Sequence, residues 1–263
     1  DRIKAMLDSN IQQAVVVGAG FIGLELVENL LQLGIDTTIV ELQDQVLPPF
    51  DKEMSTPLAE QLTRRGVKLL LGESADRFET TATGVVVHTK SGRALEVGPR
   101  GGIQVNDSLQ TSDPNIYAVG DAIEVQDFVS GEPTQIPLAG PANRQGRIAA
   151  DNVFGREVRY RGTQGTAILG LFDQTAAMTG ASEKSLQRSG IAFRKIYVHP
   201  ANHAGYYPGA EQMTLKLLFD PESGRILGAQ GIGGAGVDKR IDVLAIAIQA
   251  GMTVFDLEEV ELA

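Results

Sequence analysis

The residues with the clearest chemical potential are the three glycines of a G-x-G-x-x-G motif at residues 18–23. The motif follows a run of valines and opens a stretch with helical periodicity, which is the context that dinucleotide binding requires. Gly18 allows a tight turn, Gly20 lets the backbone approach a pyrophosphate, and Gly23 permits close packing of the helix on the strand. These glycines predict a site for a dinucleotide.

Two further features complete this unit. Phe21 and Ile22 begin the helix, where free N–H groups and the positive end of the helix dipole favour phosphate. Glu41 ends the next strand-like stretch, 23 residues after Gly18, and its carboxylate can accept a hydrogen bond from a ribose 2′-hydroxyl. Because an acid at that point disfavours a 2′-phosphate, NAD(H) is expected over NADP(H). The predicted dinucleotide-binding unit runs from Val15 to Glu41.

The same pattern occurs a second time, at residues 231–236, and is again followed by an apolar helical stretch. The strand before it is expected to belong to an antiparallel hairpin, and too few residues follow for a βαβ unit to be completed. We therefore interpret the second match as a structural turn without a ligand.

A carboxylate after another predicted strand is the next candidate. Ile116 to Val119 reads as a buried strand, and Gly120 and Asp121 follow it at once. A carboxyl group at the carboxyl edge of an open α/β sheet lies where such sheets bind ligands. Alternatively, Asp121 caps the segment that follows it.

The elements that must position these groups change in character along the chain. Residues 11–96 alternate strands and amphipathic helices as βαβ units do, and a Gly/Pro/Arg stretch at 97–102 then breaks the rhythm like a join or an omitted loop. Antiparallel strands are expected from about residue 162 onward. The predicted strands are 14–17, 37–41, 84–89, 116–119, 194–199, 213–219 and 225–230. The predicted helices are 21–33, Asp51 or Ser55 to Arg65, 142–153, and 237–250 ending at Gly251.

Composition narrows the possible functions. A net charge of −10 disfavours a broad nucleic-acid or anionic-membrane surface, and no apolar run is long enough to span a bilayer. The chain has no cysteine, which removes disulfides and thiol chemistry, and its three histidines are too scattered for a metal site. With no signal segment and no disulfides, a cytoplasmic protein is expected.

Three segments resemble one enzyme family. Residues 18–25 look like the nicotinamide-domain fingerprint of the pyridine nucleotide–disulfide oxidoreductases, and residues 111–121 resemble the second flavin signature of that family. Residues 137–147 are similar to the family helix whose N-terminus faces the isoalloxazine ring. The resemblance implies FAD and NAD(P)H as cofactors, with NADH favoured.

The resemblance also assigns roles to individual residues. Gly120 and Asp121 would hold the ribityl or pyrophosphate region of the flavin. Together with the turn that contains Pro137, Leu138 and Ala139, they would hold one side of it. Glu25, one turn into the fingerprint helix, would lie near the contact between nicotinamide and flavin; a solvated helix position is the alternative.

Two later segments narrow the resemblance to a subgroup. Residues 203–210 and 236–243 are similar to coenzyme A–disulfide reductases and NADH-dependent persulfide reductases. In that subgroup a tyrosine of the partner subunit reaches the redox cysteine, which implies a homodimer. Tyr206 is the first candidate for this catalytic role and Tyr207 the second; plain packing in a strand-to-turn corner is the alternative.

The expected fold is therefore an α/β, Rossmann-like dinucleotide-binding domain, a remnant of a flavin-binding domain, and an α+β dimerisation domain. The expected limits are 1–97 for the NAD(P)-binding domain without its last strand, 98–160 for the C-terminal part of the FAD-binding domain, and 161–263 for a truncated dimerisation domain. The N-terminal flavin fingerprint, the cysteine segment and a C-terminal tyrosine segment of the family have no counterpart here.

The expected activity is transfer of hydride from NAD(P)H through FAD to a cysteine-bound disulfide or persulfide, such as coenzyme A disulfide. A cysteine-free chain is not expected to reduce disulfides by itself. Two alternatives remain open. One is an NADH oxidase or peroxidase on the same scaffold, and the other is a non-catalytic, dimeric NADH-binding fragment.

Overall fold

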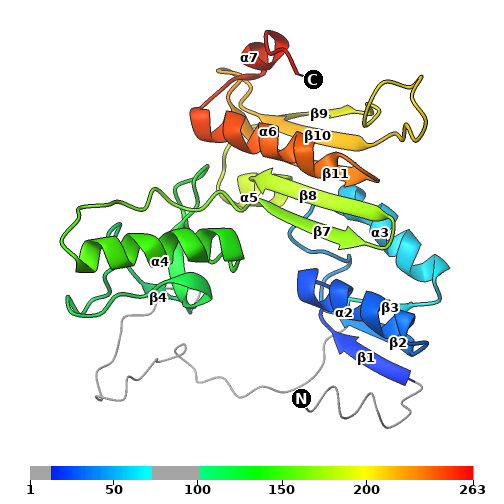
Figure 1. Ribbon diagram of the computed structural model, residues 1–263, viewed down its shortest axis with the longest axis horizontal. Helices are drawn as coiled ribbons and strands as arrows, with labels where there is room; N and C mark the ends of the chain where they lie inside the picture. The colour runs from blue at the N-terminus through cyan, green and yellow to red at the C-terminus, as the bar shows by residue number, and fades with distance from the viewer. Residues whose placement is uncertain (1–12, 73–100, 263) are drawn as a thin grey trace. The chain divides into compact units, whose positions relative to one another are not determined.

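The computed structural model describes residues 13–72 and 101–262 (Figure 1). These residues form two compact units. One unit comprises 13–72, 166–188 and 192–262, and the other comprises 101–165 with 189–191. The predicted strand at 84–89 and most of the predicted join at 97–102 lie outside the described residues.

The first part of the larger unit is a parallel sheet with crossover helices. Its elements are β1 (Gln13–Val17), α2 (Phe21–Gln32), β2 (Asp36–Glu41), α3 (Lys52–Arg64) and β3 (Lys68–Leu71). The three strands pair in parallel in the order β1-β2-β3. Leu24, Val27 and Leu30 are buried along one stripe of α2, and the helix ends at Gly34 in a left-handed conformation. The predicted βαβ unit is confirmed.

The structure decides between the two predicted starts of α3, Asp51 and Ser55. The helix begins after Asp51, which has extended backbone angles, and Ser55 is buried inside the first turn. The alternative start at Ser55 is therefore wrong, and Pro57 lies inside the helix rather than in its first turn. Asp51 is held in place by tertiary contacts that its sequence neighbourhood does not reveal. The predicted end is confirmed, with Gly66 in the left-handed region.

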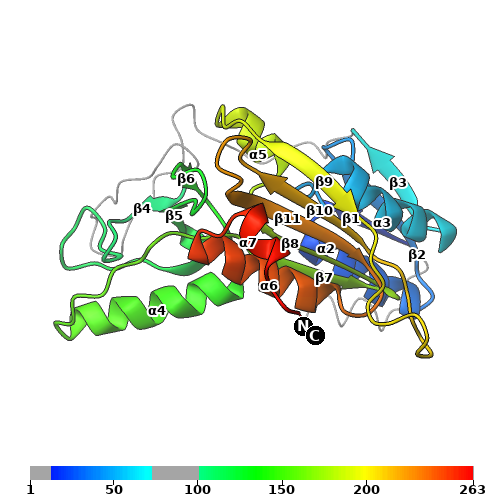
Figure 2. The same ribbon diagram turned by 90° about the horizontal axis from the view of Figure 1, so that it is seen from above.

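The second part of the larger unit is a five-stranded antiparallel sheet. In sequence order its strands are β7 (Ala167–Leu171), β8 (Gln174–Gly180), β9 (Arg194–Val198), β10 (Thr214–Phe219) and β11 (Ile226–Gly233). They lie in the order β7-β8-β11-β10-β9, so β9 is an edge strand (Figure 2). The three strands predicted here are confirmed, whereas β7 and β8, which are rich in alanine and glycine, were not predicted.

Helices complete this part. They are α5 (Glu183–Arg188), α6 (Val237–Ala250) and α7 (Val254–Glu258). The predicted limits of α6 and its stop at Gly251 are confirmed. Val237 and Ile241 of α6 pack with Ala177, Met213 and Ala229 of the sheet region, so α6 covers one face of the sheet.

The smaller unit has little regular structure besides one long helix. It contains β4 (Ile103–Gln104), the 3-10 turn η1 (Gly120–Ala122), β5 (Ile123–Gln126), β6 (Pro133–Thr134) and α4 (Ala139–Val153). The predicted strand at 116–119 is wrong. Tyr117 forms only an isolated bridge with Gln110, and Val119 is exposed. Among the described residues the segment pairs only with the turn at 109–111, which is too short for a ladder.

The helix α4 begins three residues before the predicted start at Ala142. Pro141 stands in its first turn, where the missing N–H of proline costs no hydrogen bond. The helix ends at the predicted Val153, and Gly155 follows it in a left-handed conformation. No helix among the described residues is both long and apolar enough to cross a membrane.

Candidate functional site

The glycine loop between β1 and α2 has the geometry that its sequence predicts. Gly18 has φ +98°, a conformation that side chains strongly disfavour. A Cβ on Gly23 would lie 2.0 Å from the carbonyl oxygen of Gly18, so only glycine lets the helix approach the strand end this closely. A Cβ on Gly20 would meet nothing within 4 Å. The backbone at Gly20 is therefore open to a ligand.

The first turn of α2 supplies donors at the same place. Gly20 is the N-cap, and no side chain caps the helix. The N–H groups of Phe21, Ile22 and Gly23 thus have no partner within the helix. Ile22 is exposed and Phe21 is half-buried. This helix end can accept the negative charge of a diphosphate.

Glu41 lies at the carboxyl end of β2, against the glycine loop. Its buried carboxylate accepts hydrogen bonds from the backbone N–H of Ala19 at 2.7 Å and of Gln43 at 2.8 Å. A carboxylate has about four acceptor positions, so two remain for the hydroxyls of a ribose. The structure therefore brings together the glycines, the helix end and the acid that the sequence predicted.

The connection between β2 and α3 supports the loop from the other side. The N–H of Leu47 donates to the carbonyl oxygen of Ala19 at 2.8 Å. Leu47 is buried with φ +50°, and Val46 and Phe50 beside it are buried as well. Both peptide groups of Ala19 are thus fixed, which leaves the following amides to face a ligand.

Glu25 lies on the exposed side of α2. Its carbonyl oxygen accepts a hydrogen bond from the side chain of Asn29.

The smaller unit brings its two predicted segments together. The N–H of Gly120, which has φ +75°, donates to the buried side chain of Gln145 in α4 at 2.7 Å. Asp121 is exposed beside it, within η1, and the residue that caps this turn is Val119. Asp121 therefore does not cap the segment that follows, and its carboxylate is available at the surface near the start of α4.

The three other flavin candidates form the start of α4. Leu138 is the N-cap with extended backbone angles, and no side chain caps this helix either. Pro137 and Ala139 are exposed on either side of it. The exposed carboxylate and the uncapped helix end are polar groups that suit a dinucleotide carrying a diphosphate.

The two candidate tyrosines lie on the long connection between β9 and β10. Tyr206 and Tyr207 are 83% and 61% exposed, with ring centroids 4.8 Å apart. His203 lies edge-on to Tyr207 at 6.4 Å. Neither tyrosine is buried within the chain, so packing in its own core does not explain the pair.

Family models match nearly the whole chain. A model described as pyridine nucleotide-disulphide oxidoreductase matches residues 13–92, and a second model with the same description matches residues 93–146. The dimerisation domain of that family matches residues 166–261. The chain belongs to the pyridine nucleotide-disulphide oxidoreductase family. The predicted fold class is confirmed with it.

Relatives within this family share sequence over the full chain. A coenzyme A disulfide reductase from Staphylococcus aureus is 31% identical over 284 aligned residues, which cover 100% of this chain and 64% of that protein. The structure of reduced CoADR-RHD from Bacillus anthracis is 45% identical, with a TM-score of 0.90 over 100% of this chain and 51% of that one. A NAD-dependent persulfide reductase from A. fulgidus is 34% identical, with a TM-score of 0.89, covering 100% and 53%. The chain thus spans 64% or less of each of these relatives.

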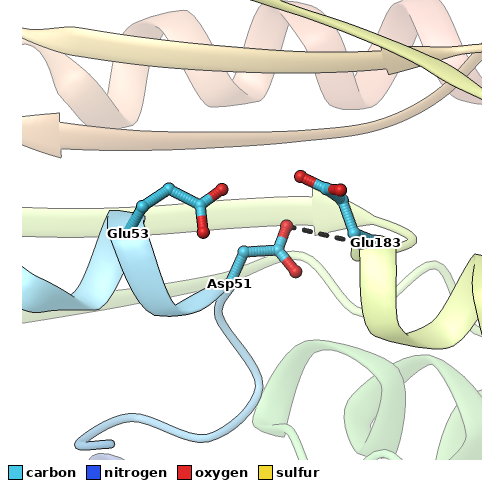
Figure 3. Close-up of side chains that lie close together, drawn as sticks. All are labelled: Asp51, Glu53 and Glu183. Carbon is cyan, nitrogen blue, oxygen red and sulfur yellow. Dashed lines mark hydrogen bonds between the residues drawn. The ribbon is translucent and has the colours of Figure 1, made fainter.

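One polar cluster of this chain was not predicted. One carboxylate oxygen from each of Asp51, Glu53 and Glu183 lies within 4.8 Å of the other two. Figure 3 shows the three side chains. Lys216 of β10 contacts all three with its ammonium group. The one sequence signal is a lysine between apolar residues in a predicted strand, because lysine is almost never fully buried unless it is paired.

Proposed function

We propose that this chain binds NADH through residues 18–41 and contributes part of the FAD site of an enzyme that reduces a cysteine-bound disulfide or persulfide, such as coenzyme A disulfide. The observation that carries the proposal is the contact between the buried Glu41 carboxylate and the glycine loop, beside the uncapped start of α2. Loop, helix end and acid together form a site for a diphosphate and a ribose.

The preference for NADH follows from charge. A 2′-phosphate placed against the Glu41 carboxylate would bring two negative groups together in a partly buried site. Leu42, the next residue, is 64% exposed and provides no positive charge to compensate. A 2′-hydroxyl, in contrast, can donate to the carboxylate.

The residues of the smaller unit fit one side of a flavin. Asp121 would accept hydrogen bonds from hydroxyls of the ribityl chain, and the start of α4 at Leu138 and Ala139 would face the ring with uncompensated N–H groups. Pro137 would form part of the same wall. Bound FAD would supply hydride transfer between NADH and a thiol-disulfide centre. None of the 263 residues is a cysteine, so no thiol step is assigned to this chain.

The acceptor is proposed from the relatives and the tyrosine loop. The relatives include a coenzyme A disulfide reductase and a persulfide reductase. The exposed hydroxyl of Tyr206 could donate a hydrogen bond to sulfur in the active site of a partner subunit, and Tyr207 is the second candidate for that role. We propose a homodimer through residues 161–263, with the other domain limits near residues 97 and 160; the match to the dimerisation domain supports this arrangement.

The proposal is tested by titrating NADH fluorescence against the purified chain, with and without added FAD. Saturable NADH binding supports the proposed dinucleotide site. A visible absorption band of bound flavin after FAD is added supports the proposed contribution to the FAD site. Absence of saturation at millimolar NADH would exclude the proposed function. Binding of NADH without any binding of FAD would favour the alternative of a dimeric NADH-binding module.

The second alternative, an NADH oxidase or peroxidase, is distinguished by the acceptor. In the complete enzyme, NADH consumption driven by oxygen or peroxide and not by coenzyme A disulfide would favour it. The Tyr206→Phe variant of the complete enzyme is expected to lose disulfide turnover while NADH still reduces the flavin. Unchanged turnover would exclude the proposed role of Tyr206.

A further inference from the structure

A row of three polar side chains crosses the antiparallel sheet on the face opposite α6. Lys216 of β10 pairs in register with Tyr197 of β9 and with Gln230 of β11, so the three side chains stand side by side on one face. The neighbours Leu215 and Gly231 point the other way, toward Val237 of α6. The polar row is therefore a feature of the face that meets α3.

All three members of the row bind the first turn of α3. The ammonium group of Lys216 lies 2.7 Å from Asp51 Oδ2 and also contacts Glu53. Gln230 donates to the same Asp51 oxygen at 2.8 Å and accepts from the Asp51 N–H at 3.0 Å. Tyr197 donates to Glu53 at 2.8 Å. The row thus binds the backbone N–H and the carboxylate of Asp51, and also the carboxylate of Glu53.

The centre of this cluster is fully buried and charged. Lys216 is 0% exposed and Asp51 has 4% of its side chain exposed. Glu183 of α5 also contacts Lys216 and is bound by Lys195 at 2.8 Å. Lys216 therefore contacts three carboxylates, and Lys195 contacts one of them. Burial alone would lower the pKa of Lys216, but its hydrogen bonds to Asp51, Glu183 and Glu53 outweigh burial and raise that pKa.

From Asp51 a short and buried path leads back to the glycine loop. Phe50, the residue before Asp51, donates its N–H to the carbonyl oxygen of Leu47 at 2.9 Å, and Leu47 donates to Ala19 at 2.8 Å. The buried amide of Gln45 donates to the carbonyl oxygen of Phe50 at 2.9 Å and is contacted by Lys184. The connection between β2 and α3 is thus attached to the sheet at one end and to the glycine loop at the other.

We propose that Lys216 is a positioning residue for the dinucleotide site, acting through Asp51 and Leu47 on Ala19 of the glycine loop. The inference rests on the proposed binding of NADH at this loop. Hydrogen bonds to both peptide groups of Ala19 fix the direction in which the next amides point. Preorganised donors bind an anion better than donors that must first be ordered. Loss of the Lys216 cluster would release the connection and so loosen the loop.

The test compares three variants with the wild-type chain. Lys216→Met removes the ammonium group and keeps an unbranched apolar side chain. The double variant Lys216→Met, Asp51→Asn also removes the buried charge that would otherwise be left unpaired, so it keeps the test valid if the single variant does not fold. Leu217→Ala is the matched control, because Leu217 is on the same strand but packs against the core under α6.

Two readouts separate positioning from general stability. The dissociation constant for NADH is expected to rise about tenfold in both Lys216 variants, because residues of one buried network are coupled in energy. It is expected to stay unchanged in Leu217→Ala. Amide hydrogen exchange at Ala19 and Leu47 is expected to speed up in the Lys216 variants at a temperature where all variants are folded. The control is expected to leave these two amides protected, although its Tm falls.

The outcomes distinguish this inference from the proposed function. If the wild-type chain does not bind NADH, the proposed function fails, whatever the variants do. If the wild type binds NADH and the Lys216 variants bind it with the same affinity and the same protection at Ala19 and Leu47, the positioning role is overturned and the proposed function stands. Faster exchange at these amides with weaker NADH binding supports both.

Discussion

The two G-x-G-x-x-G segments of this chain, residues 18–23 and 231–236, have the same spacing and opposite structural roles. The first joins a parallel strand to a helix, with Glu41 beside it. The second begins inside β11, which pairs antiparallel with β10 on one side and β8 on the other. Both are followed by a helix, so the difference lies in the strand before the glycines and in the presence of the acid.

The space around the glycines shows the same difference. A Cβ on Gly20 would meet nothing within 4 Å. A Cβ on Gly231 would lie 2.9 Å from side-chain atoms of Leu215 and Val237, and one on Gly233 would lie 2.7 Å from the Cβ of Met213. The glycine at the first site leaves room for a ligand, whereas those at the second let α6 and the sheet pack closely. The sequence interpretation of the second match as structural agrees with this antiparallel setting.

The largest expected effect is on NADH binding at the first segment. In Gly20→Val the side chain would project into the space that a pyrophosphate needs, and its Cβ would meet no protein atom within 4 Å. We expect NADH affinity to fall about 100-fold or more, equivalent to roughly 2.7 kcal/mol, with only a small fall in Tm, because valine caps a helix less well than glycine. Isothermal titration and thermal unfolding measure the two quantities. Retained affinity would mean that the dinucleotide does not lie over this loop.

At the second segment, residues 231–236, we expect a substitution to lower stability and to leave NADH affinity unchanged. In Gly231→Val the Cβ alone would lie 2.9 Å from side-chain atoms of Leu215 and Val237, and such overpacking costs about 1–3 kcal/mol. Chemical denaturation should show this loss, while the folded fraction binds NADH with wild-type affinity. Weakened NADH binding in the folded fraction would indicate that the second segment takes part in the site after all.

A smaller effect is expected on the choice between NADH and NADPH when Glu41 is replaced. Glu41→Ala combined with Leu42→Arg replaces the repulsion of a 2′-phosphate by a positive charge at an exposed position. We expect the preference for NADH over NADPH to shift about tenfold toward NADPH, or about 1.4 kcal/mol, as the ratio of the two dissociation constants. The single variant Glu41→Ala serves as the control: it should lose NADH affinity and regain only the part of NADPH affinity that the repulsion costs, so it should bind NADPH more weakly than the double variant.

The smallest effect concerns the pH dependence of the Lys216 cluster. Burial would raise the pKa of Glu53, but hydrogen bonds from Lys216, the backbone and Tyr197 outweigh it and lower this pKa from 4.5 to about 2. Because the folded-state pKa is depressed, the stabilisation is present above pH 4.5 and is lost as pH falls toward 2.

Denaturation of wild type and Glu53→Gln at several pH values measures this effect. The difference in unfolding free energy between wild type and Glu53→Gln should become smaller as pH falls from 4.5 toward 2. The change should be less than the full pKa shift implies, because the side chain of Glu53 is half exposed. A gap that stays constant from neutral pH to pH 2 would contradict the role of the charge.

Local patterns made much of the nucleotide site predictable. Gly18 follows β1, Gly23 lies in the first turn of α2, and Glu41 ends β2, so the spacing within one βαβ unit specifies where they meet. Asp121 was placed beside the start of α4 by resemblance to a family motif. The end of helix α6 at Gly251 and the turn at Gly224 before β11 follow from turn chemistry that needs no tertiary information.

What the sequence did not predict depends on partners far away along the chain. Lys216 and Asp51 are 165 positions apart, and neither shows in its own neighbourhood that it will be buried against the other. The extended segment at 116–119 has the residues of a strand, but a strand also needs a neighbour, and among the described residues it has only a short turn. The strand β8 was missed because its small and polar residues, with two alanines and one glycine, show only a weak apolar period.

The most direct test of the central assignment is an amide chemical-shift map of the isotope-labelled chain titrated with NADH. The account predicts large shifts at Gly20, Phe21, Ile22 and Gly23, where the helix donors face the diphosphate, and a shift at Gln43, whose N–H is bound to Glu41. Residues 231–236 should not shift. Shifts confined to 231–236, or none at saturating NADH, would contradict it.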